Sequence, residues 1–279
     1  MTKHIILPFI AILSIAVPLA AQDAPNLNIR FGIPSPAKAD SANREDYLIS
    51  RPQYVLSYNA KTRTPNWVSW SLRKSDIGKA KRGAFEPDPL LPTGFAKVTT
   101  NVYTDSGFDR GHMCPAQDRS SHQTDMDATF FLTNVVPQSP ASNQLAWERL
   151  ESYCRGLTKD HVLHIYCGPH GVGGEGKNGQ ADEIGKGALM VKVPAKLWKV
   201  ILVLPSEDAE PRKNTRAIAV IMPNDQSVGA DWTKYRVSVH EVEKLTGYTF
   251  FKNVSAEVAA EIKKDTDTVK VRVPKAKTP

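Results

Sequence analysis

The sequence of 279 residues predicts an α+β fold, in which helices flank a mainly antiparallel sheet. Short apolar runs bounded by turn residues predict the strands, and two stretches with helical spacing predict helices. A glycine-rich stretch over residues 169–188 lacks the strand–turn–helix frame of a phosphate-binding loop. Apolar residues make up 41% of the chain, enough for a sizeable core, and no internal repeat or composition break divides the mature chain into two domains.

The N-terminus has the pattern of a secretory signal. A basic start at Lys3, an apolar run over residues 5–17 and small residues up to Ala21 place this signal at residues 1–21. The alternative is a retained membrane anchor, but the run is short and is broken by a proline and a serine, whereas a spanning helix needs about 20 apolar residues. We therefore expect an exported protein, periplasmic or secreted, whose mature form does not sit in a membrane.

The charge of the chain favours an anionic partner. Lys and Arg number 36 against 29 Asp and Glu, which gives a net charge of +7. Loss of the signal removes one basic residue, Lys3, so the mature chain carries +6. A basic protein of this kind favours a partner such as nucleic acid. The three cysteines exclude a disulfide-dense small domain and a zinc site with four cysteine ligands.

The first half of the mature chain begins with an irregular arm over residues 22–46, where three prolines break regular structure. A folded domain over residues 47–264 is then expected. Its first half is predicted to contain strands at residues 54–58, 67–72 and 129–134, and a helix at residues 143–157.

The second half of the domain is predicted to be strand-rich. Strands are expected at residues 161–168, 189–193, 199–204 and 217–223, and the glycine-rich stretch between the first two is expected to be a flexible surface loop. A short helix over residues 240–246 should end at Gly247. Residues 265–279 are expected to form a flexible basic tail.

One segment carries the chemistry. Asp109, Arg110, Gly111 and His112 place an acid, a guanidinium, a permissive glycine and a titratable imidazole side by side. This tetrapeptide alone is a weak signal. It becomes specific with the Asn-Gln-x-x-Trp-x-x-Leu-Glu run over residues 143–151.

At these residues the chain closely resembles the DNA/RNA non-specific endonuclease family, which includes secreted bacterial sugar-non-specific nucleases and mitochondrial endonuclease G. The resemblance extends over most of the mature chain, at residues 51–58, 66–70, 133–138, 197–201 and 235–247. It implies a ββα-metal core, with a histidine on the first strand, a second strand after a loop, and a metal-ligating asparagine on the next helix.

The resemblance also implies an activity and its partners. The expected reaction is hydrolysis of phosphodiester bonds in DNA and RNA with Mg²⁺ as cofactor, and Mn²⁺ or another divalent ion as an alternative. Contacts to phosphate and sugar imply little base specificity. An inhibitor protein and the oligomeric state are not predicted.

Two residues match the centre of the family's site. His112 matches the general base, and a neutral imidazole is available for this role because its ordinary pKa is near 6.5. Asn143 matches the metal ligand, since Mg²⁺ keeps most of its waters and needs few protein oxygens. The structural alternatives are a buried or surface histidine and an asparagine that caps the helix.

Three charged residues are expected around them. Arg110 and Arg82 would bind phosphate oxygens, since a guanidinium pairs with phosphate through two hydrogen bonds. Glu151 would act through metal-bound water, because on a straight α-helix it lies roughly 80° from the face of Asn143. The alternatives are an ion pair of Arg110 with Asp109 or another acid, a lysine in place of Arg82 (Lys79 or Lys81), and an ordinary helix salt bridge for Glu151.

Four more residues are expected to support the site. Asp109 and Asn134 should orient the strand of His112, although both residue types also form turns with their own backbone. Cys114 and Cys154 are candidates for a disulfide that joins strand to helix, because exported proteins oxidise such pairs. A bond between Cys154 and Cys167, or three free thiols, are the alternatives.

Other function classes remain open from the sequence. They are a catalytically inactive nucleic-acid-binding member of the fold, a phosphodiesterase acting on another substrate such as a lipid phosphate, and a basic structural domain. Cleavage assays and loss of cleavage without His112 separate the enzyme from the other classes.

Overall fold

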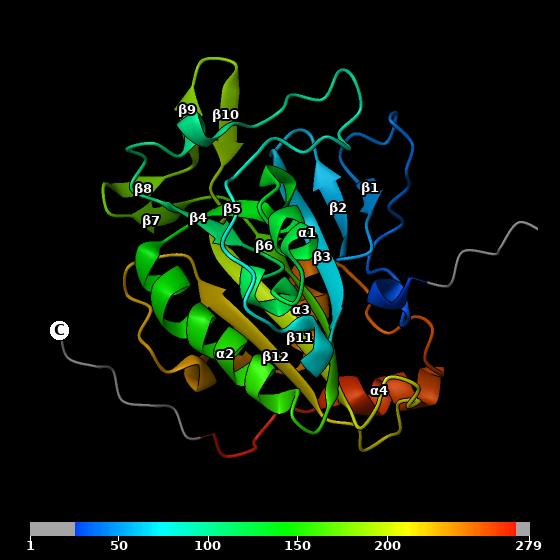
Figure 1. The fold of residues 1–279 in the computed structure, drawn as a ribbon. Coiled ribbons are helices and arrows are strands. Elements are labelled where there is room, and N and C mark those ends of the chain that lie inside the picture. The colour runs from blue at the N-terminus through cyan, green and yellow to red at the C-terminus, as the bar shows by residue number, and fades with distance from the viewer. Residues whose placement is uncertain (1–25, 272–279) are drawn as a thin grey trace, which may run out of the picture.

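The computed structural model describes residues 26–271, and its centre is one seven-stranded sheet (Figure 1). Every neighbouring pair of strands in this sheet is antiparallel. In spatial order the strands are β1 (Tyr47–Ser50), β2 (Val55–Asn59), β3 (Thr64–Leu72), β6 (Val162–His170), β11 (Lys196–Leu204), β12 (Ala217–Pro223) and β13 (Arg236–Val237). The predicted α+β class with a mainly antiparallel sheet is confirmed.

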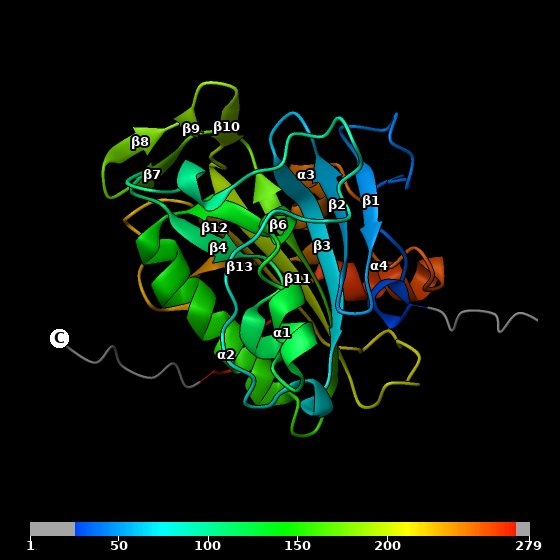
Figure 2. The same cartoon turned by 45° about the horizontal axis from the view of Figure 1, so that its top comes forward.

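Both faces of the sheet are covered, which explains the continuous apolar runs in its central strands. Helices α1 (Gln123–Ala128) and α2 (Glu148–Leu157) lie over one face, and α3 (Val239–Thr246) and α4 (Ala256–Lys264) lie over the other (Figure 2). Alternate residues of β11 enter the two cores: Leu197 and Ile201 point to the side of α2, and Trp198 and Val200 to the side of α3. The helix expected before Gly247 is α3, and Gly247 ends it in the left-handed conformation at φ 74°.

A separate hairpin and the helix after it form the ββα unit. Strand β4 (Asp109–His112) pairs with β5 (Val135–Gln138). The chain then enters a π-helical segment (Ser142–Trp147) that continues into α2. The helix expected over residues 143–157 is therefore present, with an irregular first part.

The strand expected at residues 129–134 is wrong. These residues leave α1 and form a 3₁₀ turn, Leu132–Asn134, and the strand begins only at Val135. The side chain of Asn134 donates to the carbonyls of Thr129 and Cys114, at 2.9 Å each, which bends the chain where an apolar pattern predicted extension. Pro137 is tolerated because β5 belongs to a two-stranded ribbon.

The glycine-rich stretch is more regular than expected. It forms a small hairpin, β7 (Gly174–Gly176) with β8 (Gly179–Ala181), followed by β9 (Glu183–Lys186), which pairs with β10 (Leu189–Lys192). Gly179 and Gly185 have φ of 99° and 105°, which other residues rarely adopt. The glycines thus shape tight turns, and the interpretation as a flexible loop is wrong.

The edges of the predicted domain can be followed only in part. Residues 1–21, the expected signal, lie outside the described residues, as do residues 272–279 of the expected tail. The arm before β1 packs on the sheet, with Asn28 and Phe31 buried. At the other end Asp267 is buried and forms ion pairs with Arg216 and Arg236, so the packed chain continues past residue 264. No helix within residues 26–271 is long and apolar enough to cross a membrane.

Candidate active site

Strand β4 can hold the site only because glycine stands at position 111. Gly111 pairs with Val136 of β5, and the buried side chain of Gln138, two residues further along the same strand, lies against it. A Cβ atom at position 111 would lie 2.2 Å from Gln138 Oε1, which is far inside van der Waals contact. The glycine of the tetrapeptide is therefore a packing requirement between the two strands.

His112 lies between two aromatic rings. The centroids of Phe85 and Phe130 are 5.0 and 4.8 Å from that of the imidazole. Its Nε2 atom is buried and has no hydrogen-bond partner among residues 26–271. Burial, together with the smaller effect of the positive charge of Arg82, lowers the pKa of His112 to about 3, so the imidazole is neutral at neutral pH.

The same two rings hold both predicted arginines. The guanidinium carbon of Arg110 lies 5.1 Å from the centroid of Phe85, and that of Arg82 lies 5.1 Å from the centroid of Phe130. Within the described chain neither arginine forms an ion pair or a hydrogen bond, so the alternative of an Arg110–Asp109 pair is not realised. The structure brings Arg82, Arg110 and His112 to one aromatic cluster.

Asn143 is held by the acid of the tetrapeptide. Its Nδ2 donates to Asp109 Oδ2 at 2.9 Å, and Gln144 Nε2 donates to the same oxygen at 2.8 Å. Asn143 lies inside the helical segment and is not its cap, which excludes the structural alternative considered above. Because Nδ2 is committed to Asp109, the amide oxygen Oδ1 is directed away from it and remains an acceptor.

Of the two residues expected to orient the strand of His112, Asp109 has a different role and Asn134 has the expected one. Asp109 was expected to orient the strand of His112, but its carboxylate holds Asn143 and Gln144 instead. Asn134 does hold the chain just after His112: its Oδ1 accepts from the N–H of Cys114 at 2.9 Å, and its carbonyl accepts from the N–H of Met113 at 2.9 Å.

Glu151 lies on a helix that is not straight. A π turn contains one residue more than an α turn, so Glu151 is in effect seven residues from Asn143 and lies roughly 20° from the same face instead of 80°. Its Oε1 lies 3.6 Å from the buried Nζ of Lys199, which also sits 4.1 Å from the ring centroid of Trp147. Burial raises the pKa of Glu151 to about 7 against the opposing effect of Lys199. Among residues 26–271 no hydrogen bond joins Glu151 to Asn143 or His112.

The predicted disulfide between Cys114 and Cys154 is wrong. Both cysteines and Cys167 are free and buried in the structure. Cys167 Sγ donates to the carbonyl of Met113 at 3.4 Å. Burial raises the pKa of all three thiols, which suppresses the thiolate that disulfide formation requires.

Sequence reasoning missed several residues of the site. The rings of Phe85 and Phe130 contact the two arginines and the histidine, and Lys199 pairs with Glu151. Apolar aromatic residues in separate loops carry no local signal for this role, and a lysine inside an apolar strand was the only hint of the buried ion pair.

The donor set of the site fits a hard divalent cation. The described residues contain no group of three or more His, Cys, Asp or Glu side chains that could hold a metal ion. The site instead offers the amide oxygen of Asn143, oriented by Asp109. A single protein oxygen suits Mg²⁺, which keeps most of its waters.

Comparisons with known proteins agree with this geometry. Residues 34–257 match the family model of the DNA/RNA non-specific endonucleases. A nuclease of Nostoc sp. is 40% identical over 258 residues, which cover 90% of each chain. Human endonuclease G is 31% identical over 83% of this chain and 75% of its own, and human nuclease EXOG is 36% identical over 71% of this chain but only 55% of its own.

A solved structure shows the same fold. A chain in the crystal structure of the EndoG/EndoGI complex superposes with a TM-score of 0.67 at 29% identity, covering 82% of this chain and 91% of that one. The predicted ββα-metal fold is thereby confirmed. On the family match, the relatives and the fold together, this chain belongs to the DNA/RNA non-specific endonuclease family.

Proposed function

We propose that this nuclease is an exported, divalent-metal-dependent endonuclease that hydrolyses phosphodiester bonds of both DNA and RNA. The observation that carries the proposal is the aromatic cluster. It presents a neutral imidazole with an uncommitted Nε2 beside two guanidinium groups that bind no acid among residues 26–271, next to an asparagine held by Asp109.

His112 is the proposed general base. The imidazole must be neutral to take a proton from the attacking water, and burial between Phe85 and Phe130 keeps it neutral. A strongly lowered pKa also makes a weak base. A phosphate group bound beside Arg82 would offset the positive charge that lowers this pKa, and so would raise the basicity of His112 when substrate is present.

Arg110 and Arg82 are the proposed phosphate ligands. A guanidinium over an aromatic ring is stabilised through the ring face, and this contact uses none of its N–H donors. All five donors of each arginine therefore remain for phosphate oxygens and for the charge that develops on them during the reaction.

Asn143 is the proposed metal ligand through Oδ1, with Asp109 fixing the plane of its amide. When bound, Mg²⁺, or Mn²⁺ or another divalent ion as an alternative, supplies positive charge at the phosphate and the leaving oxygen. Glu151 is proposed to act through ordered water near Asn143. The π turn brings it toward the same face, and its pair with Lys199 fixes the carboxylate.

The substrate range follows from what the site offers. Its uncommitted groups suit phosphate and not base edges, so we propose little selection by base or by sugar. The +6 charge of the mature chain favours association with a polyanion. Export is proposed from the N-terminal pattern. Since the EndoG relative is solved with EndoGI, an inhibitor protein is a further partner to test for.

A cleavage assay tests the proposal. Purified mature protein is incubated with plasmid DNA, RNA and single-stranded DNA, with Mg²⁺ or with a chelator. We expect all three to be cut with Mg²⁺ and none with chelator, and His112→Ala to lower the rate about 10³-fold. Intact substrates under Mg²⁺ would refute the activity, and a fully active His112→Ala variant would refute the base.

A further inference from the structure

We propose that Asn224, in the turn after β12, is a positioning residue that sets where Asn143 stands. The inference rests on the proposed function, because the role of Asn143 as metal ligand is part of it. Asn224 lies outside every motif that the sequence offers, and it reaches the site through the fold alone.

Asn224 is fully buried and uses its entire side chain. Its Oδ1 accepts from the N–H of Ser139 at 2.7 Å. Its Nδ2 donates to the carbonyls of Pro137 and Pro194, at 3.0 and 2.8 Å. The side chain thus joins the end of β5 to the chain between β10 and β11.

The segment that Asn224 holds has few other ways to be anchored. Pro137 and Pro140 have no N–H, so Ser139 is one of only two residues between them that can donate from the backbone. The bond from Ser139 to Asn224 therefore fixes the peptide just before the helical segment begins.

That peptide leads directly to Asn143. The carbonyl of Ser139 accepts from the N–H of Asn143 at 2.8 Å. The loop after β12 makes a second contact with this segment: Gln226 Oε1 accepts a hydrogen bond from the N–H of Ala141 at 3.2 Å. Asn143 is therefore fixed from two sides, its side chain by Asp109 on β4 and its backbone by the turn after β12.

The irregular helix explains why this tie matters. A π-helical segment depends on tertiary contacts for its position, and such segments are frequent at functional sites. Metal sites commonly lose about 10- to 100-fold in affinity when a group that orients a ligand is removed. A shift of the Ser139 peptide would move Asn143 relative to Asp109, and with it the amide oxygen.

The glycine-rich stretch makes room for this residue. A Cβ atom at Gly174 would lie 2.8 Å from both Nδ2 and the carbonyl oxygen of Asn224. The next residue, Glu175, donates its N–H to that carbonyl at 2.9 Å. The β7–β8 hairpin thus packs against Asn224 and helps to fix it.

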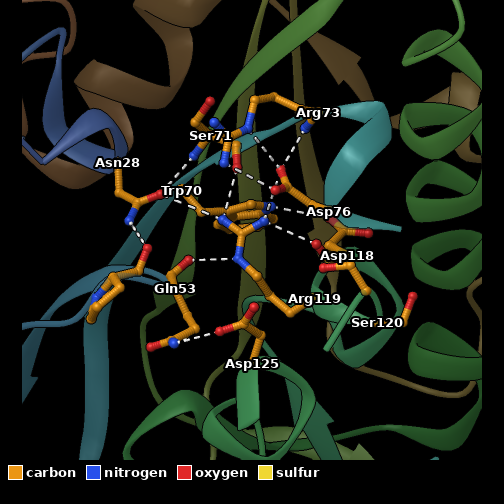
Figure 3. Close-up of polar contacts among 12 residues, drawn as sticks. Asn28, Gln53, Trp70, Ser71, Arg73, Asp76, Asp118, Arg119, Ser120 and Asp125 are labelled. Atoms are coloured by element: carbon orange, nitrogen blue, oxygen red, sulfur yellow. Dashed lines mark hydrogen bonds and ion pairs between the residues drawn. The ribbon is translucent and has the colours of Figure 1, made fainter. Parts of the chain in front are cut away.

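The test compares Asn224→Ala with a matched control. Asn28 is also a buried asparagine, 4% exposed, and its side chain bonds the carbonyl of Pro52 and the N–H of Ser71, in the polar cluster of Figure 3. We measure the Kd of each variant for Mn²⁺ alone by titration calorimetry, its unfolding in urea, and kcat and KM on plasmid DNA. Asn143→Ala serves as the reference for loss of the ligand.

We expect Asn224→Ala to raise the Kd for Mn²⁺ about 10-fold and to lower kcat more than it changes KM. Asn28→Ala should lose similar stability and keep its Kd within about twofold. Gln226→Ala, which removes one bond from a half-buried side chain, should raise the Kd about two- to threefold, and it answers the question if Asn224→Ala does not fold.

Two results would overturn the inference, and they separate an error about Asn224 from an error about the proposed metal ligand. If Asn143→Ala raises the Kd but Asn224→Ala and Gln226→Ala match the Asn28→Ala control, Asn224 has only a structural role while the proposed ligand stands. If Asn143→Ala itself leaves the Kd unchanged, the proposed ligand is wrong and the inference fails with it.

Discussion

Two clusters on the α1 side of the sheet contain arginines, and they differ in how their donors are used. Arg119 is buried, and its guanidinium forms four hydrogen bonds and one ion pair (Figure 3). Its partners are the carbonyls of Gln53, Ser71 and Asp118, Oδ1 of Asn28 and Oδ2 of Asp76. Arg82 and Arg110 lie on aromatic rings and bind no protein acceptor within residues 26–271.

The difference separates stability from function. A buried polar group with every partner in place holds the fold, because removing one member leaves the others unpaired. A group with an uncommitted donor or acceptor contributes little to folding and is available to a ligand. By this criterion Arg119 belongs to the scaffold, although it is as basic as the arginines proposed to bind substrate.

The largest expected effect falls on the scaffold. Arg119→Met should lower the free energy of unfolding by about 3–5 kcal/mol, because it removes one ion pair of Asp76, which keeps its pair with Arg73, and leaves several buried carbonyls without their donor. Urea unfolding measures this loss. The kcat of the folded protein, measured at low temperature, should stay within about threefold of wild type. A variant that keeps its stability but loses kcat would reverse the assignment of the two clusters.

Arg110→Lys should show the opposite pattern. A lysine keeps the charge but loses the planar pair of donors, so we expect kcat to fall about 100-fold while the urea midpoint is unchanged. Arg82→Lys is the parallel variant on the other ring. Single-turnover cleavage of a plasmid at saturating Mg²⁺ measures the chemical step. A comparable loss of stability in either variant would mean that these arginines also hold the fold.

A smaller effect is expected at Gly111, where packing and function meet. Gly111→Ala places a Cβ against Gln138 and should cost about 1–3 kcal/mol of stability, with a loss of kcat as β4 shifts. A Cβ at position 111 would also lie 2.6 Å from Cβ of Gln138, so removing that whole side chain in Gly111→Ala/Gln138→Gly should recover part of both. The double-mutant cycle measures the coupling. Additive losses would show that the glycine is needed for some reason other than Gln138.

How much of this could be predicted from the sequence depends on how local each contact is. The tetrapeptide at residues 109–112 and Asn143 lie in short motifs, so the ββα unit and its helix could be predicted from them, although the second strand was expected at residues 129–134 and begins only at Val135. The partner of Asp109 was missed because Asn143 comes to it across the hairpin, and Phe130 was missed because an apolar run gives no reason to expect it beside a histidine.

Two further errors have physical causes of their own. The expected direction of Glu151 assumes an ideal α-helix. The π turn, which no residue pattern indicates, rotates Glu151 toward the face of Asn143. The disulfide was expected from the compartment and from the order of the cysteines along the chain, whereas the burial of Cys114 and Cys154 as free thiols is set by the packed core.

The smallest expected effect is on the pH dependence of stability and of the cleavage rate. It compares two buried histidines that have a similar pKa but differ in their hydrogen bonds. Burial lowers the pKa of both His112 and His164 to about 3, but Nε2 of His164 pairs with Ser69 Oγ at 3.2 Å, while that of His112 has no partner in the described chain. Both are neutral when folded and have an ordinary pKa near 6.5 when unfolded.

The pH dependence of stability follows from the difference between the folded and unfolded pKa values of the two histidines, and the pH dependence of the rate follows from the uncommitted Nε2 of His112. Below pH 6.5 the unfolded chain takes up protons that the folded chain does not, so each histidine lowers stability as the pH falls from 6.5 toward 3. Only His112 should shape the rate. The acid limb of kcat/KM, which reports the free enzyme, should lie well below pH 6.5, and the limb of kcat should lie higher because bound phosphate raises the basicity of His112. Rate profiles from pH 4 to 8 measure both limbs, with His164→Asn as the control that changes only the stability curve. A kcat/KM limb at 6.5 would show that His112 is solvated in the free enzyme, and the proposed contrast between His112 and His164 would then fail.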